Sequence, residues 1–209
     1  MDLTGLKGKF YFFDKSKYGR IYVFVDFGNV RPWAKEFWGK ENKLKIYQEV
    51  DIAKLAEVIN WIFPIKKLFY YGHYLKNENF SEEHKNNNKY RLSIFRLNKA
   101  RKSGFEVKTK EIKMISHFNE SGAFLEKTLK CNFDVEITMD MIIKAEKYDS
   151  IMLFSGDSDF GGLLSYLKSK GKKIIVVCTR NRMSEELRIV ADIFIPAETL
   201  KRFLKLENN

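Results

Sequence analysis

Cysteine and histidine are both scarce in this chain of 209 residues. Its two cysteines, Cys131 and Cys178, lie far apart and in no paired motif, which argues against a disulfide framework and against a zinc site. The three histidines are scattered, so no histidine-based metal site or Ser-His-Asp triad is indicated. Walker and Gly-x-Gly-x-x-Gly motifs are lacking too, which removes the common nucleotide-binding classes.

Long hydrophobic runs are also lacking. No apolar stretch approaches the roughly 20 residues that a membrane span needs, and residues 1–8 do not contain the apolar core of a signal peptide. We therefore expect a cytoplasmic protein that does not enter a membrane. The length suits one domain over residues 1–209, with a core of about 18–200.

Acidic residues are fewer than basic ones. The chain has 38 Lys and Arg against 27 Asp and Glu, a formal net charge of +11. An excess of this size usually signals an anionic partner, most often nucleic acid. The alternative is lysine enrichment across a whole proteome, which the many Lys, Asn and Ile residues fit too. We favour a nucleic-acid partner.

Strand-like and helix-like segments alternate along the chain. Strands are predicted at 20–26, 67–73, 105–115, 150–155, 172–178 and 192–195, and a short extra strand at 9–13. Helices are predicted at 51–63, 90–103, 134–147, 160–170, 185–190 and 197–206. Segments 75–88 and 118–129 stay ambiguous. This alternation predicts an α/β fold, a three-layer α/β/α sandwich with a central, mainly parallel sheet.

Apolar spacing predicts which side of each helix is buried. In the helix at 90–103 the inward residues are expected to be Leu92, Phe95, Leu97 and Ala100, and in the helix at 134–147 they are Val135, Met139, Ile142 and Ile143. The irregular stretch 31–45 contains Trp33 and Trp38, which could stack on bases or pack over the core. We favour the core, because large aromatic residues are mostly buried.

Carboxylates follow two of the predicted strands. Asp26 ends the apolar run at 20–26, and Asp157 and Asp159 come directly after the run at 150–155. Asp134 opens the helix before that second run and is expected to point to the same edge. Ligands of parallel α/β sheets bind at the carboxyl ends of the strands. A cluster of acids there repels itself unless a cation or a proton neutralises it, which indicates a metal site.

Oxygen-only ligands suit Mg²⁺ or Mn²⁺. Such ions can activate water and hold a phosphate during phosphodiester hydrolysis. Each acid also has a simpler interpretation, since Asp157 or Asp159 could cap a helix and Asp26 could end a strand in a turn.

Other charged residues near this edge have less direct roles. Asp140 lies six residues after Asp134, about 120° around the helix and about 9 Å along it, so we expect it to support the site without ligating the same metal. Arg180 and Arg182 follow the strand at 172–178 and are candidates for binding substrate phosphates. Lys130 is a candidate for neutralising or orienting the acids. A solvated basic turn is the alternative for the two arginines.

Four segments together resemble the motifs of the NYN domain, a PIN-like nuclease family that includes LabA-type bacterial proteins. They are Asp-Phe-Gly-Asn at 26–29, the stretch 132–140, Ser-Gly-Asp-Ser-Asp-Phe at 155–160, and 184–187 with 191–194. The resemblance spans roughly residues 18–200, and segment 104–130 has no counterpart in it.

The resemblance implies a PIN-like α/β/α fold and a metal-dependent endoribonuclease acting on RNA. Carried over by position, the catalytic and metal-binding residues are Asp26, Asp134, Asp157 and Asp159. The substrate-binding set is Asn29, Lys130, Ser155, Arg180, Arg182 and Ser184, and Asp140 matches a motif acid. The alternative is a non-catalytic RNA-binding or regulatory PIN-like module. A Toprim-like phosphotransfer site is a further enzyme alternative, although such sites usually have Glu after the first strand, where this chain has Asp26.

Overall fold

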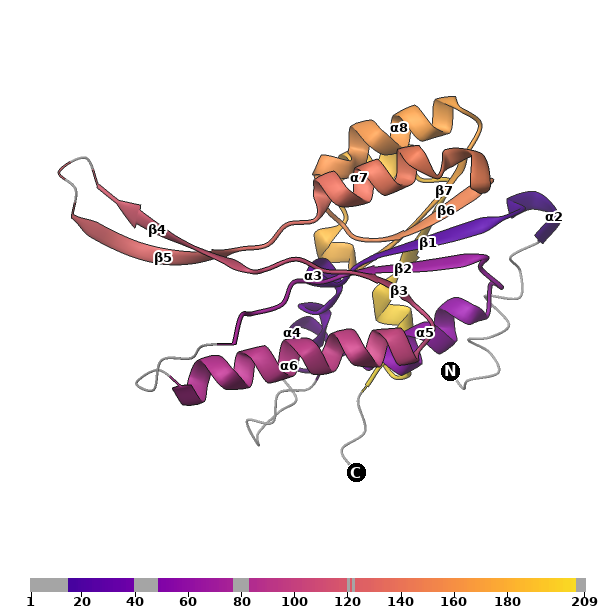
Figure 1. The fold of residues 1–209 in the computed structure, drawn as a ribbon. Helices are drawn as coiled ribbons and strands as arrows, with labels where there is room; N and C mark the ends of the chain where they lie inside the picture. Colours follow the sequence, from indigo (N-terminus) through magenta and orange to yellow (C-terminus); the bar gives the residue numbers. More distant parts are fainter. Residues whose placement is uncertain (1–14, 40–48, 77–82, 120, 122, 206–209) are drawn as a thin grey trace.

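A computed structural model describes residues 15–39, 49–76, 83–119, 121 and 123–205. A six-stranded sheet forms the middle layer, in the order β3-β2-β1-β6-β7-β8 (Figure 1). Its strands are β1 (Ile21–Asp26), β2 (Lys66–Tyr70), β3 (Glu106–Lys108), β6 (Ser150–Phe154), β7 (Lys173–Cys178) and β8 (Ile193–Pro196). Every pairing between neighbouring strands is parallel, which confirms the predicted α/β class.

The strand order reverses between β1 and β6. From β1 the chain builds the sheet outward through β2 and β3, then returns to place β6 on the other side of β1. β1 and β6 are buried along their whole length, as their unbroken apolar sequences predict. Crevices at such reversal points, at the carboxyl ends of the strands, are where ligands of open α/β sheets bind.

Helices cover both faces of the sheet. α7 (Asp134–Ile143) and α8 (Gly161–Ser169) lie on one face, and α5 (Ile52–Asn60) and α6 (Glu83–Lys102) lie on the other (Figure 1). Shorter helices are α2 (Lys15–Tyr18), α3 (Phe27–Val30), α4 (Trp33–Trp38) and α9 (Glu185–Val190). The 3₁₀ turns are η2 (Ala145–Lys147), η3 (Ser158–Phe160), η4 (Arg180–Arg182) and η5 (Ala197–Leu200). In the described part of the chain, no helix is both long and apolar enough to cross a membrane.

Several local predictions are confirmed and several are wrong. Asp51 caps α5 and Ser184 caps α9 with their side-chain oxygens, and Gly104 follows α6 with a φ of +81°. Trp33 and Trp38 are buried in the core, although their segment is helical where an irregular stretch was expected. The terminal helix predicted at 197–206 is wrong, because the described residues 197–205 contain only the short turn η5. The strand proposed at 9–13 lies outside the described residues.

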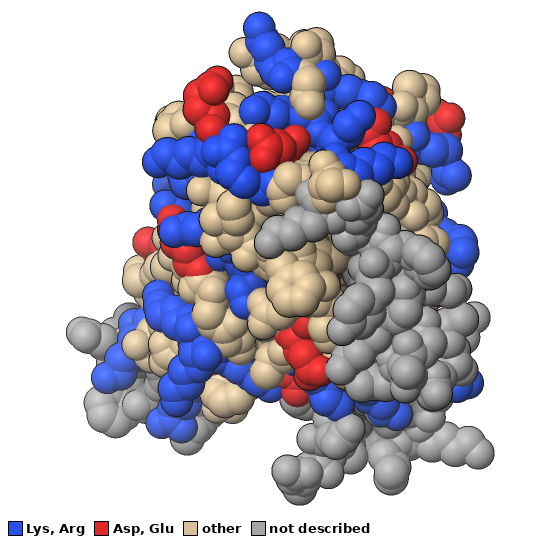
Figure 2. All heavy atoms as spheres, turned by 90° about the vertical axis from the view of Figure 1, so that its right-hand side faces the viewer, with Lys and Arg blue, Asp and Glu red and all other residues tan. Residues whose placement is uncertain are grey.

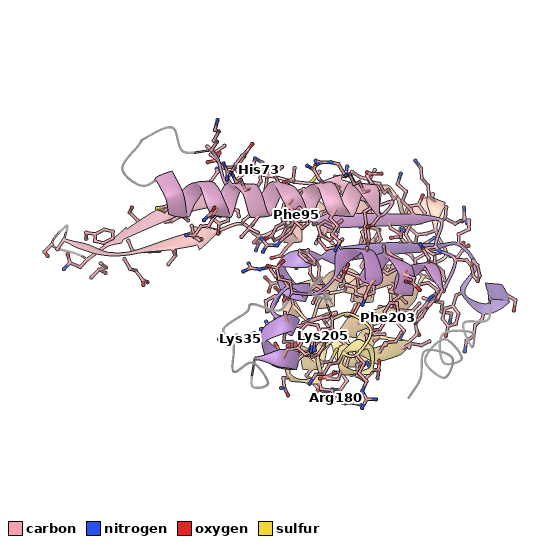
Figure 3. The ribbon with its side chains drawn as sticks, turned by 90° about the horizontal axis from the view of Figure 1, so that it is seen from below. Lys35, His73, Phe95, Arg180, Phe203 and Lys205 are labelled. Carbon is pink, nitrogen blue, oxygen red and sulfur yellow. The ribbon has the colours of Figure 1, made fainter. Side chains whose placement is uncertain are left out.

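The buried sides of two helices were predicted wrongly. On α7, the four residues expected inside are all exposed, and the core side chains are Ile137 and Met141. The exposed residues are Val135, Met139, Ile142 and Ile143. On α6, Leu97 and Ala100 are buried as expected, but Leu92 and Phe95 face solvent, and Phe95 is labelled in Figure 3.

Segment 105–115 does not form one strand. Its first part is β3, at the edge of the main sheet, and its last part begins a separate antiparallel hairpin of β4 (Lys113–Phe118) and β5 (Phe124–Lys130). This hairpin extends well beyond the sheet, in the same direction as α6 (Figures 1 and 3). Most of the described residues in the ambiguous stretch 118–129 therefore belong to β5, the second strand of this projecting hairpin.

Basic side chains are not confined to the carboxyl edge of the sheet. Figure 2 shows the side of the molecule at which β1 begins, and Lys and Arg are widespread there as well. The net charge by itself therefore does not locate a nucleic-acid groove, and the position of the carboxylates has to do so.

Candidate metal centre

Asp26 occupies the last position of β1, beside the carboxyl end of β6. Its carboxylate caps α3, accepting hydrogen bonds from the backbone N–H of Gly28 at 3.1 Å and of Asn29 at 3.4 Å. The Asn29 side chain donates a further bond to Oδ2 at 2.7 Å. Only 6% of Asp26 is exposed. Burial raises the pKa of Asp26, and the charge of Asp157 raises it further, against the lowering effect of these hydrogen bonds.

Asp157 and Asp159 lie on the loop that leaves β6. The hydroxyl of the buried Ser155 accepts a hydrogen bond from the Asp157 N–H, and Asp157 Oδ1 accepts one from the Asp159 N–H at 3.1 Å. A glycine is needed at position 156, between Ser155 and Asp157, because a Cβ there would lie 2.2 Å from the carbonyl oxygen of Arg182. The loop after β7 is thereby packed directly against this acidic turn.

Asp134 reaches the same place from α7. The side chain of Asn132 forms two hydrogen bonds with Asp134. Its oxygen accepts a hydrogen bond from the Asp134 N–H at 3.0 Å, and its amide donates one to Asp134 Oδ2. The pKa of Asp134 is raised to about 6, first by burial and then by the charges of the other three aspartates, that of Asp157 being the largest. The repulsion between neighbouring carboxylates thus adds to the effect of burial at this position.

Three of the four predicted acids form a tight group. One carboxylate oxygen from each of Asp134, Asp157 and Asp159 lies within 4.8 Å of the other two. Oxygens on opposite sides of an ion bound at about 2.1 Å are separated by about 4.2 Å, so small side-chain rotations suffice for all three to hold one ion. Asp26 stands outside this group, deeper in the protein, and is linked to it through its charge. The donor set is all oxygen, as Mg²⁺ or Mn²⁺ requires.

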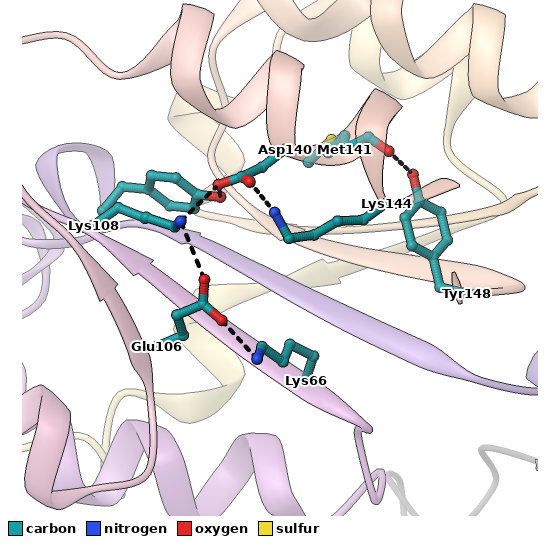
Figure 4. Close-up of polar contacts among 8 residues, drawn as sticks. Lys66, Glu106, Lys108, Asp140, Met141, Lys144 and Tyr148 are labelled. Atoms are coloured by element: carbon teal, nitrogen blue, oxygen red, sulfur yellow. Dashed lines mark hydrogen bonds and ion pairs between the residues drawn. The ribbon is translucent and has the colours of Figure 1, made fainter. Parts of the chain in front are cut away.

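Asp140 lies away from this group, as the helix geometry predicted. It accepts a hydrogen bond from the Tyr70 hydroxyl at 2.7 Å and forms ion pairs with Lys144 and Lys108. Lys108 also forms an ion pair with Glu106 at 3.2 Å, so these residues belong to a chain of alternating charges (Figure 4). The structure gives Asp140 a role in fastening α7 to the sheet at β2 and β3.

The predicted substrate-binding cations differ in whether they already form ion pairs within the protein. Arg182 is paired with Glu36, and Arg180 with Glu198 through its backbone N–H at 2.9 Å and its side chain at 4.0 Å. Figure 3 shows Arg180 at the edge of the molecule. Lys130, at the end of β5, is exposed and has no ion pair among the described residues.

The two candidate serines already accept hydrogen bonds within the protein. Ser155 supports the acidic turn, and the hydroxyl of Ser184 accepts from the N–H of Leu187 at the start of α9. Their roles toward substrate stay predictions. Asn132 was not anticipated, although its position two residues before Asp134 is typical of an Asx turn.

The family model of the NYN domain matches residues 20–200. The chain belongs to the NYN domain family. Its alignment with the low amplitude and bright protein LabA of Synechococcus elongatus is 33% identical over 102 residues, covering 49% of this chain and 53% of that protein. The chain thus aligns with about half the length of this curated relative.

A solved structure has the same fold as this NYN domain. A crystal structure of a protein of unknown function from Vibrio parahaemolyticus superposes with a TM-score of 0.58, over 90% of this chain and 96% of that one. At 22% identity the likeness concerns the fold alone.

Proposed function

We propose that this NYN domain is a Mg²⁺- or Mn²⁺-dependent endoribonuclease that hydrolyses RNA phosphodiester bonds. The observation that carries the proposal is the convergence of Asp134, Asp157 and Asp159 from two separate chain segments. Their position at the reversal point of the sheet, and membership of a PIN-like family, support a phosphate-processing site. Asp134, Asp157 and Asp159 would hold the ion.

Each acid would have a distinct part in this site. A bound divalent cation supplies Lewis-acid activation of the phosphodiester and of the attacking water. Asp157 and Asp159 are fixed by the turn after β6, and Asp134 by Asn132, so the ligands are positioned before any ion arrives. The buried Asp26 adds negative charge behind them and is held in place by Asn29.

A non-catalytic RNA-binding module is the second candidate. It is favoured by the fact that Asp26 and Asp157 each cap a turn of helix, a role that needs no metal. The pairing of Arg180 and Arg182 with glutamates also leaves fewer free cations at this edge than the sequence suggests. Cytoplasmic location and the preference for RNA over DNA are part of the proposal.

The test is incubation of the purified protein with labelled RNA and with matched DNA, in Mn²⁺, in Mg²⁺ and in EDTA. We expect RNA cleavage that requires the metal. Equal cutting of RNA and DNA would contradict a ribonuclease, and cutting that survives EDTA would contradict any metal mechanism. RNA binding without cleavage under all conditions would favour the second candidate.

A further inference from the structure

A cavity of about 250 Å³ opens beside the metal centre. It lies where the base of the β4–β5 hairpin meets the carboxyl ends of β1 and β2. Its walls include Arg31, Tyr71, Tyr74, Leu129, Cys131 and Phe133. Gly72 allows Cys131 to pack closely against it in this lining, because a Cβ there would lie 2.5 Å from Cys131 Sγ. None of these residues belongs to the carboxylate group.

The cavity and the acidic group share their chain segments. Gly28 lines the cavity and donates its backbone N–H to Asp26. Phe133 lines it and is followed directly by Asp134. The base of a nucleotide is joined to its phosphate through one ribose. A phosphate held at the carboxylates therefore carries its neighbouring base into the space in front of this cavity.

The cavity walls combine aromatic rings with a cation. Tyr71 is fixed from behind by Arg96, whose guanidinium donates to its hydroxyl at 3.3 Å. Tyr74 is half-buried, and its hydroxyl has no hydrogen-bond partner within the described part of the chain. Arg31 is exposed and, among the described residues, has no carboxylate partner. Unstacked RNA bases are recognised by stacking on aromatic rings and Arg planes and by hydrogen bonds to their edges.

We propose that this cavity receives the nucleobase adjacent to the phosphate at the acidic group, with Tyr74 and Arg31 as its binding residues. The proposal rests on the proposed function, since it takes the acidic group as the phosphate site. The volume of the cavity lies just below the roughly 300–1,000 Å³ of drug-sized ligand pockets, and this size suits a single base. The apolar wall supplied by Leu129 and Cys131 favours the face of a flat aromatic ring over a second phosphate. The enzyme would then require single-stranded RNA, because a paired base cannot enter.

The test compares two labelled RNA tetranucleotides of equal charge, one with bases and one abasic at every position. Binding is measured by fluorescence anisotropy in EDTA, using the Asp157→Asn protein so that RNA is not cut. Phosphate contacts are the same for both probes, so the ratio of their affinities reports base recognition alone. We expect the RNA with bases to bind at least about fivefold tighter, the lower end of base–aromatic stacking.

Two further substitutions in that protein locate the recognition. Tyr74→Ala and Arg31→Ala should each reduce the ratio toward one, and Tyr74→Phe should keep most of it. The matched control is Tyr166→Ala on α8, an exposed tyrosine with Lys170 at 5.5 Å, as Tyr74 has Lys89 at 5.7 Å. A ratio near one in the starting protein, or a ratio that neither Tyr74→Ala nor Arg31→Ala changes, would overturn the assignment. Thermal melts confirm that each variant folds. Because Arg31 is exposed, the affinity ratio of Arg31→Ala tests the cavity even if substitution of the half-buried Tyr74 disturbs the fold.

Cleavage by the unsubstituted protein in Mn²⁺ separates this proposal from the proposed function. Base-dependent binding that Tyr74→Ala removes, together with no cleavage, retains the cavity assignment and rejects the nuclease. Metal-dependent cleavage together with a ratio of one retains the nuclease and rejects the cavity assignment.

Discussion

The side-chain amide of Asn29 donates a hydrogen bond to Oδ2 of Asp26 across 2.7 Å, and this bond favours the charged form of a carboxyl whose pKa is raised by burial. The two residues are three positions apart, on β1 and in the first turn of α3. Because Asp26 is only 6% exposed, no solvent can replace the bond if the amide is removed.

We therefore expect Asn29→Ala to destabilise the protein by about 1.5–3 kcal/mol at pH 8, the value of a hydrogen bond to a charged group. The loss should shrink to about 0.5–1.5 kcal/mol in acid, where the partner is neutral. The sign follows from the bond itself, because the hydrogen bond from Asn29 lowers the pKa of Asp26, and its loss therefore destabilises the charged carboxylate more than the neutral acid. Denaturant melts against pH measure this, with Asn98→Ala on the exposed side of α6 as control. A pH-independent loss would contradict the assignment.

Asp157→Asn separates an enzyme from a scaffold. Asparagine keeps the shape and caps η3 about as well as aspartate, while one negative charge leaves the cluster. We expect metal-dependent cleavage to be abolished, apo stability to be unchanged or slightly increased, and RNA binding in EDTA to be kept or strengthened. The deciding measurement is the cleavage rate at saturating Mn²⁺, with melts of both proteins. A variant that cuts at the wild-type rate would remove Asp157 from the catalytic residues.

Asp140→Asn tests whether Asp140 stabilises the fold or binds the metal ion. This change weakens the ion pairs with Lys144 and Lys108 but leaves Asp134, Asp157 and Asp159 in place. We expect lower stability and nearly unchanged Mn²⁺ affinity in calorimetric titration. Tyr70→Phe should lower stability by about 1 kcal/mol for the lost hydrogen bond, also without affecting the metal. A large loss of Mn²⁺ affinity in Asp140→Asn would show that Asp140 belongs to the metal site.

Of the three cations predicted at this edge, Lys130 has no ion pair among the residues that the structure describes, so its removal should change RNA binding most. Loss of one single-strand phosphate contact makes the slope of log affinity against log salt shallower by about 0.7. We expect that change for Lys130→Ala and smaller ones for Arg180→Ala and Arg182→Ala, which are already paired with glutamates. Lys173→Ala, at the start of β7 and thus at the opposite edge, is the control. An unchanged slope after all three substitutions would exclude a groove here.

The sequence by itself determined the central strands and the place of the acids. β1, β6 and β7 are unbroken apolar runs because both their faces are covered, and such runs are visible without a structure. Asp26, Asp134, Asp157 and Asp159 stand where these runs end or a helix starts, so parallel topology was enough to bring them to one edge. The caps Asp51 and Ser184 were also readable, because capping depends on neighbours within a few residues.

Only the tertiary structure decided what depends on packing between distant segments. α7 has apolar residues on two different sides, so its sequence fits two orientations, and contact with the sheet chose Ile137 and Met141 over Val135 and Met139. The cavity at Tyr74 likewise combines residues that follow β1, residues that follow β2 and residues at the base of the hairpin, from Gly28 to Phe133 along the chain. Local patterns report burial and turns along one segment, whereas the walls of a cavity exist only once separate segments have been brought together by the fold.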